Sequence, residues 1–182
     1  MDERVDILTE KGVHTGRSCM KSEAHRKGYW HPCIHIWVYN SERSVLIQQR
    51  SSTKDTFPSK WDVSVAGHVG ENEDPRMAAQ RELHEEVGIT CQRNELESVD
   101  YFASEFFHSN GIIDREYHFV YLIRKEIALE DLSYQEEEVN QAQWIPMTMM
   151  LEMSNPSVAA FDFVPYPQDY LKRIHDKILD RF

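Results

Sequence analysis

Residues 67–89 constrain the structure of this chain more than any other segment. Asp74 followed by Pro75 predicts the start of a helix, because aspartate accepts hydrogen bonds at an N-cap and proline suits the first helical position. Gly88 predicts its end, since glycine adopts the left-handed conformation that closes many helices. Between these positions apolar residues recur every four residues: Ala79, Leu83 and Val87. The segment is therefore typical of an amphipathic helix with one buried stripe.

A different face of this helix is acidic, with carboxylates at i, i+3 and i+4: Glu82, Glu85 and Glu86. Like charges at this spacing repel by roughly 0.2–0.5 kcal/mol a pair, and carboxylates near the C-terminus oppose the helix dipole. A sequence that breaks two local rules commonly does so at a functional site. A Mg²⁺ ion would remove the conflict, because it prefers oxygen ligands and is often held by a few carboxylates. A solvated acidic surface is the alternative that three glutamates alone would favour.

The surrounding residues favour the metal site over the solvated surface. The segment reads G-x5-E-x7-R-E-U-x-E-E-x-G-U, where U is aliphatic, with Gly67, Glu73, Arg81 and Gly88 at fixed positions. Arg81 is expected to pair with Glu73 and so hold the preceding loop against the helix. This pattern resembles the box of the Nudix hydrolases. The resemblance implies an α+β fold with a mixed β-sheet packed between helices, an α/β/α sandwich. It also implies Mg²⁺-dependent cleavage of a diphosphate, with Mn²⁺ as an alternative ion.

Composition limits the class of protein and its partners. With 182 residues and 41% hydrophobic content, the chain suits one globular domain over 1–182. Its net charge of −11 argues against binding nucleic acid or an anionic membrane, so an anionic substrate would need a metal and local basic groups. The three cysteines lack a C-x-x-C pairing, and no apolar run approaches the ~20 residues of a membrane span. We therefore expect a cytoplasmic protein that acts on a small molecule.

Alternating hydrophobicity and turn residues predict the remaining elements. An N-terminal β-hairpin is expected over 4–17, and strands are expected over 33–39, 44–50, 61–66, 98–107, 117–123 and 142–145. A short helix over 148–153 and an amphipathic C-terminal helix over 170–178 complete the prediction. Strands and helices mix without regular βαβ alternation, which indicates an α+β arrangement.

Over about residues 4–146 the chain also resembles type 1 isopentenyl-diphosphate isomerase and its hydrolase-like relatives. The matching residues include Lys21, His25, His31, Arg50, Lys54, Trp61, His68 and an acidic-x-Glu pair at Asp114 and Glu116. The resemblance implies a metal site with these ligands: His25, His31, His68 and Glu116, with Asp114 as a further one. It implies diphosphate contacts by Arg50 and Lys54, whose guanidinium and ammonium groups suit phosphate oxygens. A structural role stays open for the three histidines, and we interpret His35, His84, His108 and His118 as structural or exposed.

The residue before Gly67 and His68 distinguishes hydrolysis from isomerisation. The isomerase carries its catalytic cysteine there, whereas this chain has Ala66 and a complete hydrolytic box. We therefore expect hydrolysis of a nucleoside diphosphate linked to another group X. The expected catalytic residues are Glu82, Glu85, Arg81 and Glu116, and the expected metal ligands include Glu82, Glu85, Glu86 and Glu116. Either Glu82 or Glu116 would act as general base. An isomerase-like enzyme and a catalytically silent nucleotide-binding module are the alternatives, and the resemblance suggests a homodimer.

Overall fold

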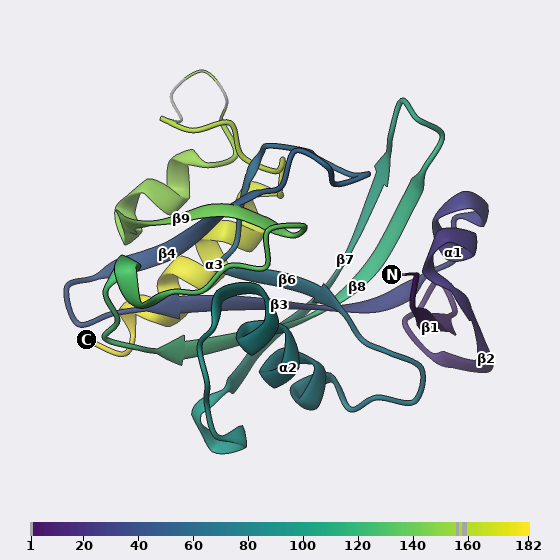
Figure 1. The fold of residues 1–182 in the computed structure, drawn as a ribbon, viewed down its shortest axis with the longest axis horizontal. Coiled ribbons are helices and arrows are strands. Elements are labelled where there is room, and N and C mark those ends of the chain that lie inside the picture. The colour runs from purple at the N-terminus through teal and green to yellow at the C-terminus, as the bar shows by residue number, and fades with distance from the viewer. Residues whose placement is uncertain (1, 156, 158–159) are drawn as a thin grey trace.

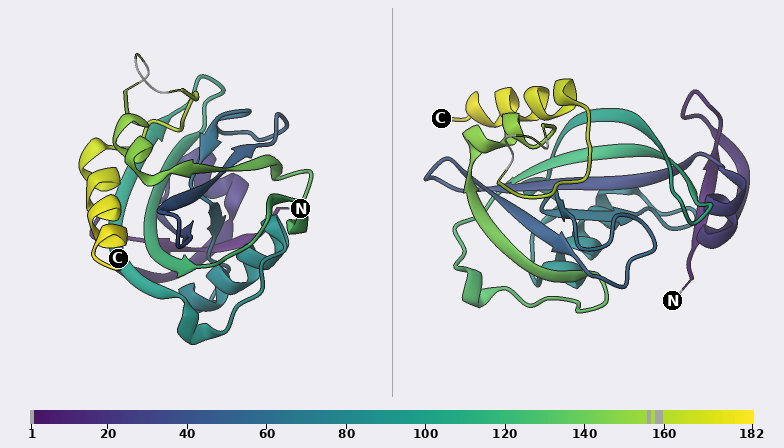
Figure 2. Two further views of the ribbon diagram at one scale, coloured as in Figure 1. Left: turned by 90° about the vertical axis from the view of Figure 1, so that its left-hand side faces the viewer. Right: turned by 90° about the horizontal axis from the view of Figure 1, so that it is seen from above.

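Strand β3 (His31–Tyr39) runs through the middle of the molecule, and all nine of its residues are buried. The computed structural model describes residues 2–155, 157 and 160–182. Successive side chains of a strand point to opposite faces, so β3 separates two layers of core. Its even-numbered residues, such as Ile36, pack with helix α2 (Pro75–Val87). Odd-numbered Trp37 packs with helix α3 (Gln168–Leu179) on the other face, and Figures 1 and 2 show the sheet between the two helices.

The sheet is mixed, and its strands form two groups that meet at one turn. β3 pairs in parallel with β8 (Ile113–Arg124) and antiparallel with β6 (Val65–His68), and β7 (Glu97–Phe107) extends the sheet beyond β8. β4 (Ser44–Arg50) instead pairs antiparallel with β5 (Trp61–Asp62) and β9 (Val139–Pro146). β3 and β4 are ladder partners only where Tyr39 lies opposite Val45. The two groups diverge from that point, and the candidate site lies between them.

Ser64 ties the two groups together where the chain crosses from β5 to β6. Its hydroxyl donates a hydrogen bond to the Leu46 carbonyl at 2.6 Å and accepts one from the Val38 amide at 2.8 Å. The single strand predicted over 61–66 is therefore wrong. The segment forms two short strands because its halves pair with different partners, Trp61 and Asp62 with β4 and Val65 onward with β3.

The N-terminal segment forms a small unit at one end of the sheet. β1 (Arg4–Leu8) and β2 (His14–Met20) make the predicted antiparallel hairpin. A short helix, α1 (Lys21–Lys27), follows and ends at Gly28 with φ of 63°. The sequence did not predict α1, because it buries only Ala24 and so shows no apolar periodicity. This unit packs against β3 and β8 and brings α1 to their N-terminal ends.

The expected α+β fold, with a mixed sheet between helices and an N-terminal hairpin, is confirmed. Several boundaries differ from the prediction by a few residues, and two differences concern the site and the type of helix. β8 begins at Ile113, which places Asp114 and Glu116 within a strand, and the helix expected over 148–153 is the 3-10 helix η3 (Met147–Glu152). Two further 3-10 helices, η1 (Arg93–Glu95) and η2 (Leu129–Asp131), lie in connections. Among the residues that the structure describes, no helix combines the length and the apolar content needed to cross a bilayer.

Two leucines of α3 test how much this helix contributes to the core. Leu171 is fully buried, whereas Leu179 at the end of the helix is 42% exposed. Leu171→Ala should lower the free energy of unfolding by about 2–5 kcal/mol, because it removes buried methyl groups and leaves a cavity. Leu179→Ala should change it by about 0.5 kcal/mol or less. Urea denaturation followed by circular dichroism measures both, and equal effects would show that α3 does not pack as described.

Candidate functional site

Arg81 organises the acidic face of α2. Its guanidinium donates to both carboxylate oxygens of Glu73, at 3.0 and 2.9 Å, and to the His68 carbonyl at 3.1 Å. It also donates to Glu82 at 2.7 Å and Glu85 at 3.1 Å. The expected pair with Glu73 is present. Since these contacts use all five N–H donors of the guanidinium, we expect Arg81 to hold the loop and the glutamates in place rather than contact a substrate.

The ends of α2 form as the sequence predicts. The Asp74 side chain accepts hydrogen bonds from the amides of Arg76 and Met77, at 3.0 and 3.2 Å. Gly88 closes the helix with φ of 74° and donates its N–H to the His84 carbonyl. Both caps satisfy backbone groups that a helix end leaves free, so the helix is held in register with the loop before it.

Gly67 is required by the close approach of Glu82. A Cβ added to Gly67 would lie 2.3 Å from the Cδ of Glu82, a distance that no real pair of atoms adopts. Glu82 is 8% exposed and Glu86 is 2% exposed, so both carboxyls are withdrawn from water behind β6. Burial raises the pKa of Glu82.

Glu86 is the most deeply buried carboxyl of the box. Its Oε2 atom has no hydrogen-bond partner among the described residues. Burial raises the pKa of Glu86 well above its ordinary value, and neighbouring Glu82 raises it further, while Lys54 and Arg50 oppose the shift. An unpaired buried carboxylate is costly, so Glu86 is suited to meeting a cation.

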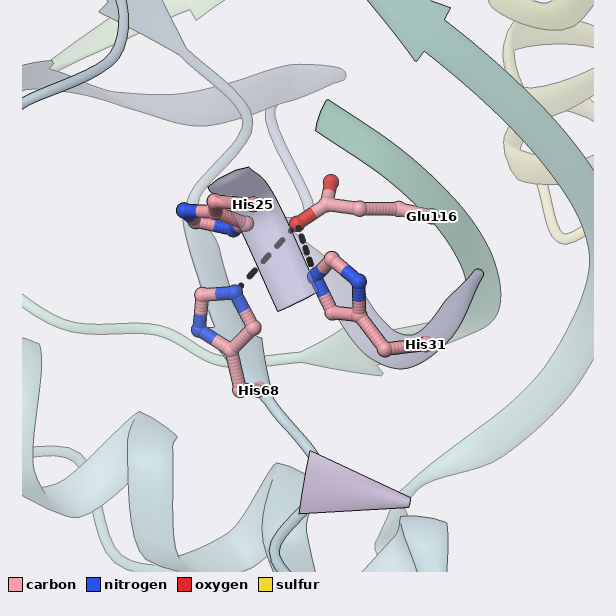
Figure 3. Close-up of side chains that lie close together, drawn as sticks. All are labelled: His25, His31, His68 and Glu116. Atoms are coloured by element: carbon pink, nitrogen blue, oxygen red, sulfur yellow. Dashed lines mark ion pairs between the residues drawn. The ribbon is translucent and has the colours of Figure 1, made fainter. Parts of the chain in front are cut away.

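A second group of potential ligands lies at the N-terminal ends of β3 and β8. One donor atom from each of four residues lies within 4.8 Å of all the others: His25, His31, His68 and Glu116. Figure 3 shows the four side chains converging on one point. Glu116 Oε1 lies 3.4 Å from His68 Nε2 and 3.7 Å from His31 Nε2. These separations are long for hydrogen bonds but suit ligands that share one ion, because two atoms each about 2.1 Å from a cation are commonly 3–4 Å apart.

Strand register explains why these residues meet. On β3 the side chains of His31, Cys33 and His35 share the face that farther along carries Trp37. His31 lies opposite Glu116 of β8, and Cys33 lies opposite His68 of β6. His25 comes from α1, whose Gly28 turn leads the chain into β3. The same sheet face is therefore apolar under α3 and polar at its open end.

The charges in this group are strongly coupled. Burial opposes ionisation of Glu116, but the facing imidazoles of His31 and His68 hold its pKa well below the ordinary value. Burial also opposes protonation of His68, yet the carboxylates of Glu116 and Glu3 raise its pKa to about 9. Burial, with His31 and His68 nearby, lowers the pKa of His25 to about 3. The buried Nε2 atoms of all three histidines have no hydrogen-bond partner among the described residues.

A cavity of about 790 Å³ connects this group with two basic residues, one at the end of β4 and one in the loop after it. Arg50, Lys54, His25, His68 and Glu116 all line it. The lining does not include Glu82, Glu85 or Glu86; Glu82 lies behind Gly67, which does line the cavity. Lys54 is paired with Glu138, and Arg50 donates to Asp62 at 2.9 Å and to the Thr56 carbonyl at 3.1 Å. Arg50 is thus anchored within the wall of the cavity.

Sequence reasoning missed several residues of this cavity. The missed residues are Cys33, Asp62 and Tyr166. Cys33 Sγ lies 2.9 Å from Glu116 Oε1, and the Tyr166 hydroxyl donates to Asp62 at 2.7 Å. The alternation of His31, Cys33 and His35 on one strand was a usable signal for Cys33. Tyr166 follows the last predicted strand by many residues, so no local pattern could place it.

Comparison with known proteins assigns the family. A family model described as the NUDIX domain matches residues 30–166. The chain is 33% identical to Nudix hydrolase 3 of Arabidopsis thaliana over 88% of its own length, but it spans only 22% of that protein. It is 38% identical to an uncharacterised Nudix hydrolase of Clostridium acetobutylicum, covering 76% of this chain and 67% of that one. It is also 28% identical to an isopentenyl-diphosphate isomerase of Photorhabdus laumondii, covering 85% and 84% of the two chains. The chain belongs to the Nudix family.

Solved structures agree on the fold. A Deinococcus radiodurans protein aligns with a TM-score of 0.67 and 19% identity, covering 94% of this chain and 98% of the other. The Nudix domain of Shewanella oneidensis NrtR, solved in complex with ADP ribose, aligns with a TM-score of 0.59 and 13% identity, covering 81% and 87%. At these identities the likeness concerns the fold alone.

The contact between Gly67 and Glu82 gives a direct test of the box. Gly67→Ala should destabilise the protein by about 1–3 kcal/mol, because the added methyl group must displace the Glu82 carboxyl or the strand. Gly70→Ala is the matched control, since its Cβ would come no closer than 3.2 Å to the nearest atom, the Oε2 of Glu73. Urea denaturation of both variants measures the difference, and a Gly67→Ala variant as stable as Gly70→Ala would contradict this packing.

Proposed function

We propose that this protein hydrolyses the diphosphate linkage of a nucleoside diphosphate joined to a second group X, with Mg²⁺ as the cofactor and Mn²⁺ as a substitute. The observation that carries the proposal is the buried Glu86 carboxyl, which lacks a partner on Oε2 and faces Lys54 and Arg50. A cation there would meet carboxylates on one side and phosphate oxygens held by basic groups on the other. We assign that cation to Glu82, Glu85 and Glu86.

Some residues of the chain would position the substrate, and one would transfer a proton. When bound, Mg²⁺ neutralises phosphate charge and lowers the pKa of a water molecule. Arg50 and Lys54 line the cavity and present positive charge to the diphosphate. The two candidate bases differ in their surroundings: burial raises the pKa of Glu82, which lies behind Gly67, whereas two imidazoles hold the pKa of Glu116, which lines the cavity, below its ordinary value.

We also propose that His25, His31, His68 and Glu116 hold a second divalent cation. The support is the convergence of four donor atoms within 4.8 Å and the three unpartnered imidazole nitrogens. Imidazole ligands favour borderline metals such as Zn²⁺, Co²⁺ and Mn²⁺ more than Mg²⁺. Because His25 and Glu3 come from the N-terminal unit, we further propose that residues 1–182 act as one domain rather than only residues 30–166.

The size of the cavity supports a substrate larger than a five-carbon diphosphate. About 790 Å³ falls in the upper part of the range that encloses drug-sized ligands. The lining of the cavity also includes apolar and aromatic side chains, among them Phe57, Phe106 and Val164, which come from other segments than the proposed metal ligands. A nucleoside and a second group, such as those joined in ADP ribose, would contact this surface.

Replacing Glu86 tests the proposal. Glu86→Gln keeps the shape of the side chain but removes the negative charge, so turnover should fall at least about a hundredfold, since a metal contact contributes several kcal/mol. The control is Glu130→Gln, an exposed glutamate of η2. Hydrolysis with Mg²⁺ and Mn²⁺ would be measured by chromatographic separation of the phosphorylated products, monophosphates included. The substrates would be nucleoside di- and triphosphates, nucleotide sugars, coenzyme A, dinucleoside polyphosphates and prenyl diphosphates. A Glu86→Gln variant with full activity would refute the assignment.

Cys33 supports isomerisation as a second candidate function. Ala66 replaces the isomerase cysteine, but Cys33 on the adjacent strand points into the same cavity with its thiol 2.9 Å from Glu116. A thiol and a carboxyl so placed are able to exchange protons with a bound alkene. On the hydrolase proposal, isopentenyl diphosphate should give no allylic isomer by NMR in the presence of Mg²⁺. Isomer formation that disappears in Cys33→Ala would favour the second function.

A further inference from the structure

A histidine outside the four-residue group faces the same polar region. His108 follows β7 at the tip of the β7–β8 hairpin, and its Nε2 atom is buried without a partner among the described residues. That atom lies 3.9 Å from Asp114 Oδ2. The other oxygen of Asp114, Oδ1, lies 3.7 Å from His25 Nε2, and both of these atoms also lack hydrogen-bond partners. Asp114 therefore stands between His25 and His108, with one oxygen toward each.

The separations suit cation binding better than hydrogen bonding. At 3.7 and 3.9 Å, neither imidazole makes a hydrogen bond to Asp114. A cation held at about 2.0–2.2 Å from each of two ligand atoms fits between atoms 3.9 Å apart, because twice that bond length exceeds the separation. Leaving these groups buried and unpaired costs free energy, which a bound cation would offset.

The position of His108 is fixed by its surroundings. Its backbone N–H donates to the Ile112 carbonyl at 2.9 Å, and its carbonyl accepts from Gly111 at 3.0 Å. The imidazole packs edge-on against Phe57, with 4.7 Å between ring centroids. The ring is thus held before any ion arrives, which lowers the entropic cost of using it as a ligand.

The hairpin tip also holds the loop that carries Lys54. The side chain of Asn110 donates to the Asp55 carbonyl at 2.8 Å, next to Lys54 in the sequence. Phe57 of this loop adopts φ of 48°, a conformation that a bulky residue keeps only when its neighbours enforce it. Phe106 and His108 supply such neighbours, with ring centroids 5.0 and 4.7 Å from Phe57. The hairpin tip and the Lys54 loop therefore form one packed unit.

We propose that His108 and Asp114 form an additional cation-binding position that extends the His25, His31, His68 and Glu116 group, and that occupancy of this position further stabilises the packed hairpin tip and Lys54 loop over the cavity. The inference rests on the cation centre proposed above. It assigns a ligand role to a residue that sequence analysis interpreted as structural. It also links the two ends of the cavity, since a cation at Asp114 would act on Lys54 through His108 and Asn110.

Co²⁺ binding to the full chain tests the ligand role. Titrations would be followed by visible absorption with Mg²⁺ in excess, so that the carboxylates of α2 are saturated. His108→Phe keeps an aromatic ring against Phe57 but removes the nitrogen, and it should weaken Co²⁺ binding at least about tenfold. His14→Phe, at an exposed histidine of the N-terminal hairpin, should bind as the unchanged protein does. A Kd for His108→Phe within about twofold of the unchanged protein would overturn the proposal.

Hydrogen exchange tests the coupling to the loop. Co²⁺ should slow exchange of the amides in residues 51–57 and 107–112, and His108→Phe should abolish this protection. Protection that persists in the variant would overturn the coupling. If His108→Phe unfolds, His108→Gln replaces it under the same criteria.

A third variant separates this inference from the proposed function. His31→Ala should abolish Co²⁺ binding, and if it does not, the four-residue centre itself is wrong. Loss of hydrolysis in Glu86→Gln, or its retention, leaves the Co²⁺ result for His108 unaffected, because the binding assay requires no turnover.

Discussion

The complete burial of β3 is the constraint on which the rest of this structure depends. A strand covered on both faces must place every second side chain against a different layer, and β3 does so along nine residues. One face carries Ile34, Ile36 and Val38 against α2. The other changes character along its length, from His31, Cys33 and His35 at one end to Trp37 and Tyr39 at the other. Core and site are therefore two ends of the same surface.

This arrangement places charged groups where water is scarce. Glu82, Glu86, Asp114 and His31 are all buried, and several of their polar atoms lack partners. Such groups weaken the folded state unless something compensates them. Arg81 offsets the charge of Glu82 within a network of five hydrogen bonds. The apolar layers around α2 and α3 supply the remaining stability. The fold can tolerate this cost because most of its core is elsewhere and well packed.

The parts of the molecule that the sequence predicted are those that local chemistry decides. Asp74, Pro75 and Gly88 set the ends of α2 through neighbouring backbone groups, and the pair of Arg81 with Glu73 follows from a fixed spacing. Helix α1 was not predicted, because its seven residues bury a single alanine and therefore show no apolar periodicity. Cys33 reaches the cavity through pairing of β3 with β6 and β8, strands distant in sequence, and His108 lies at the tip of the β7–β8 hairpin. Their positions depend on strand register, which a single sequence does not specify.

Arg50, a predicted diphosphate contact, has surroundings that the sequence alone does not describe. As a phosphate contact it would be expected to extend freely into the cavity, yet three of its five N–H groups bind Asp62 and Thr56. Asp62 is held in turn by Tyr166, whose hydroxyl also lies 3.3 Å from His35. The guanidinium is thus fixed by a buried network that reaches from β4 to the segment before α3. A guanidinium held in this way would lose little freedom on meeting an anionic substrate, so on the proposed function the network that anchors Arg50 would also favour binding.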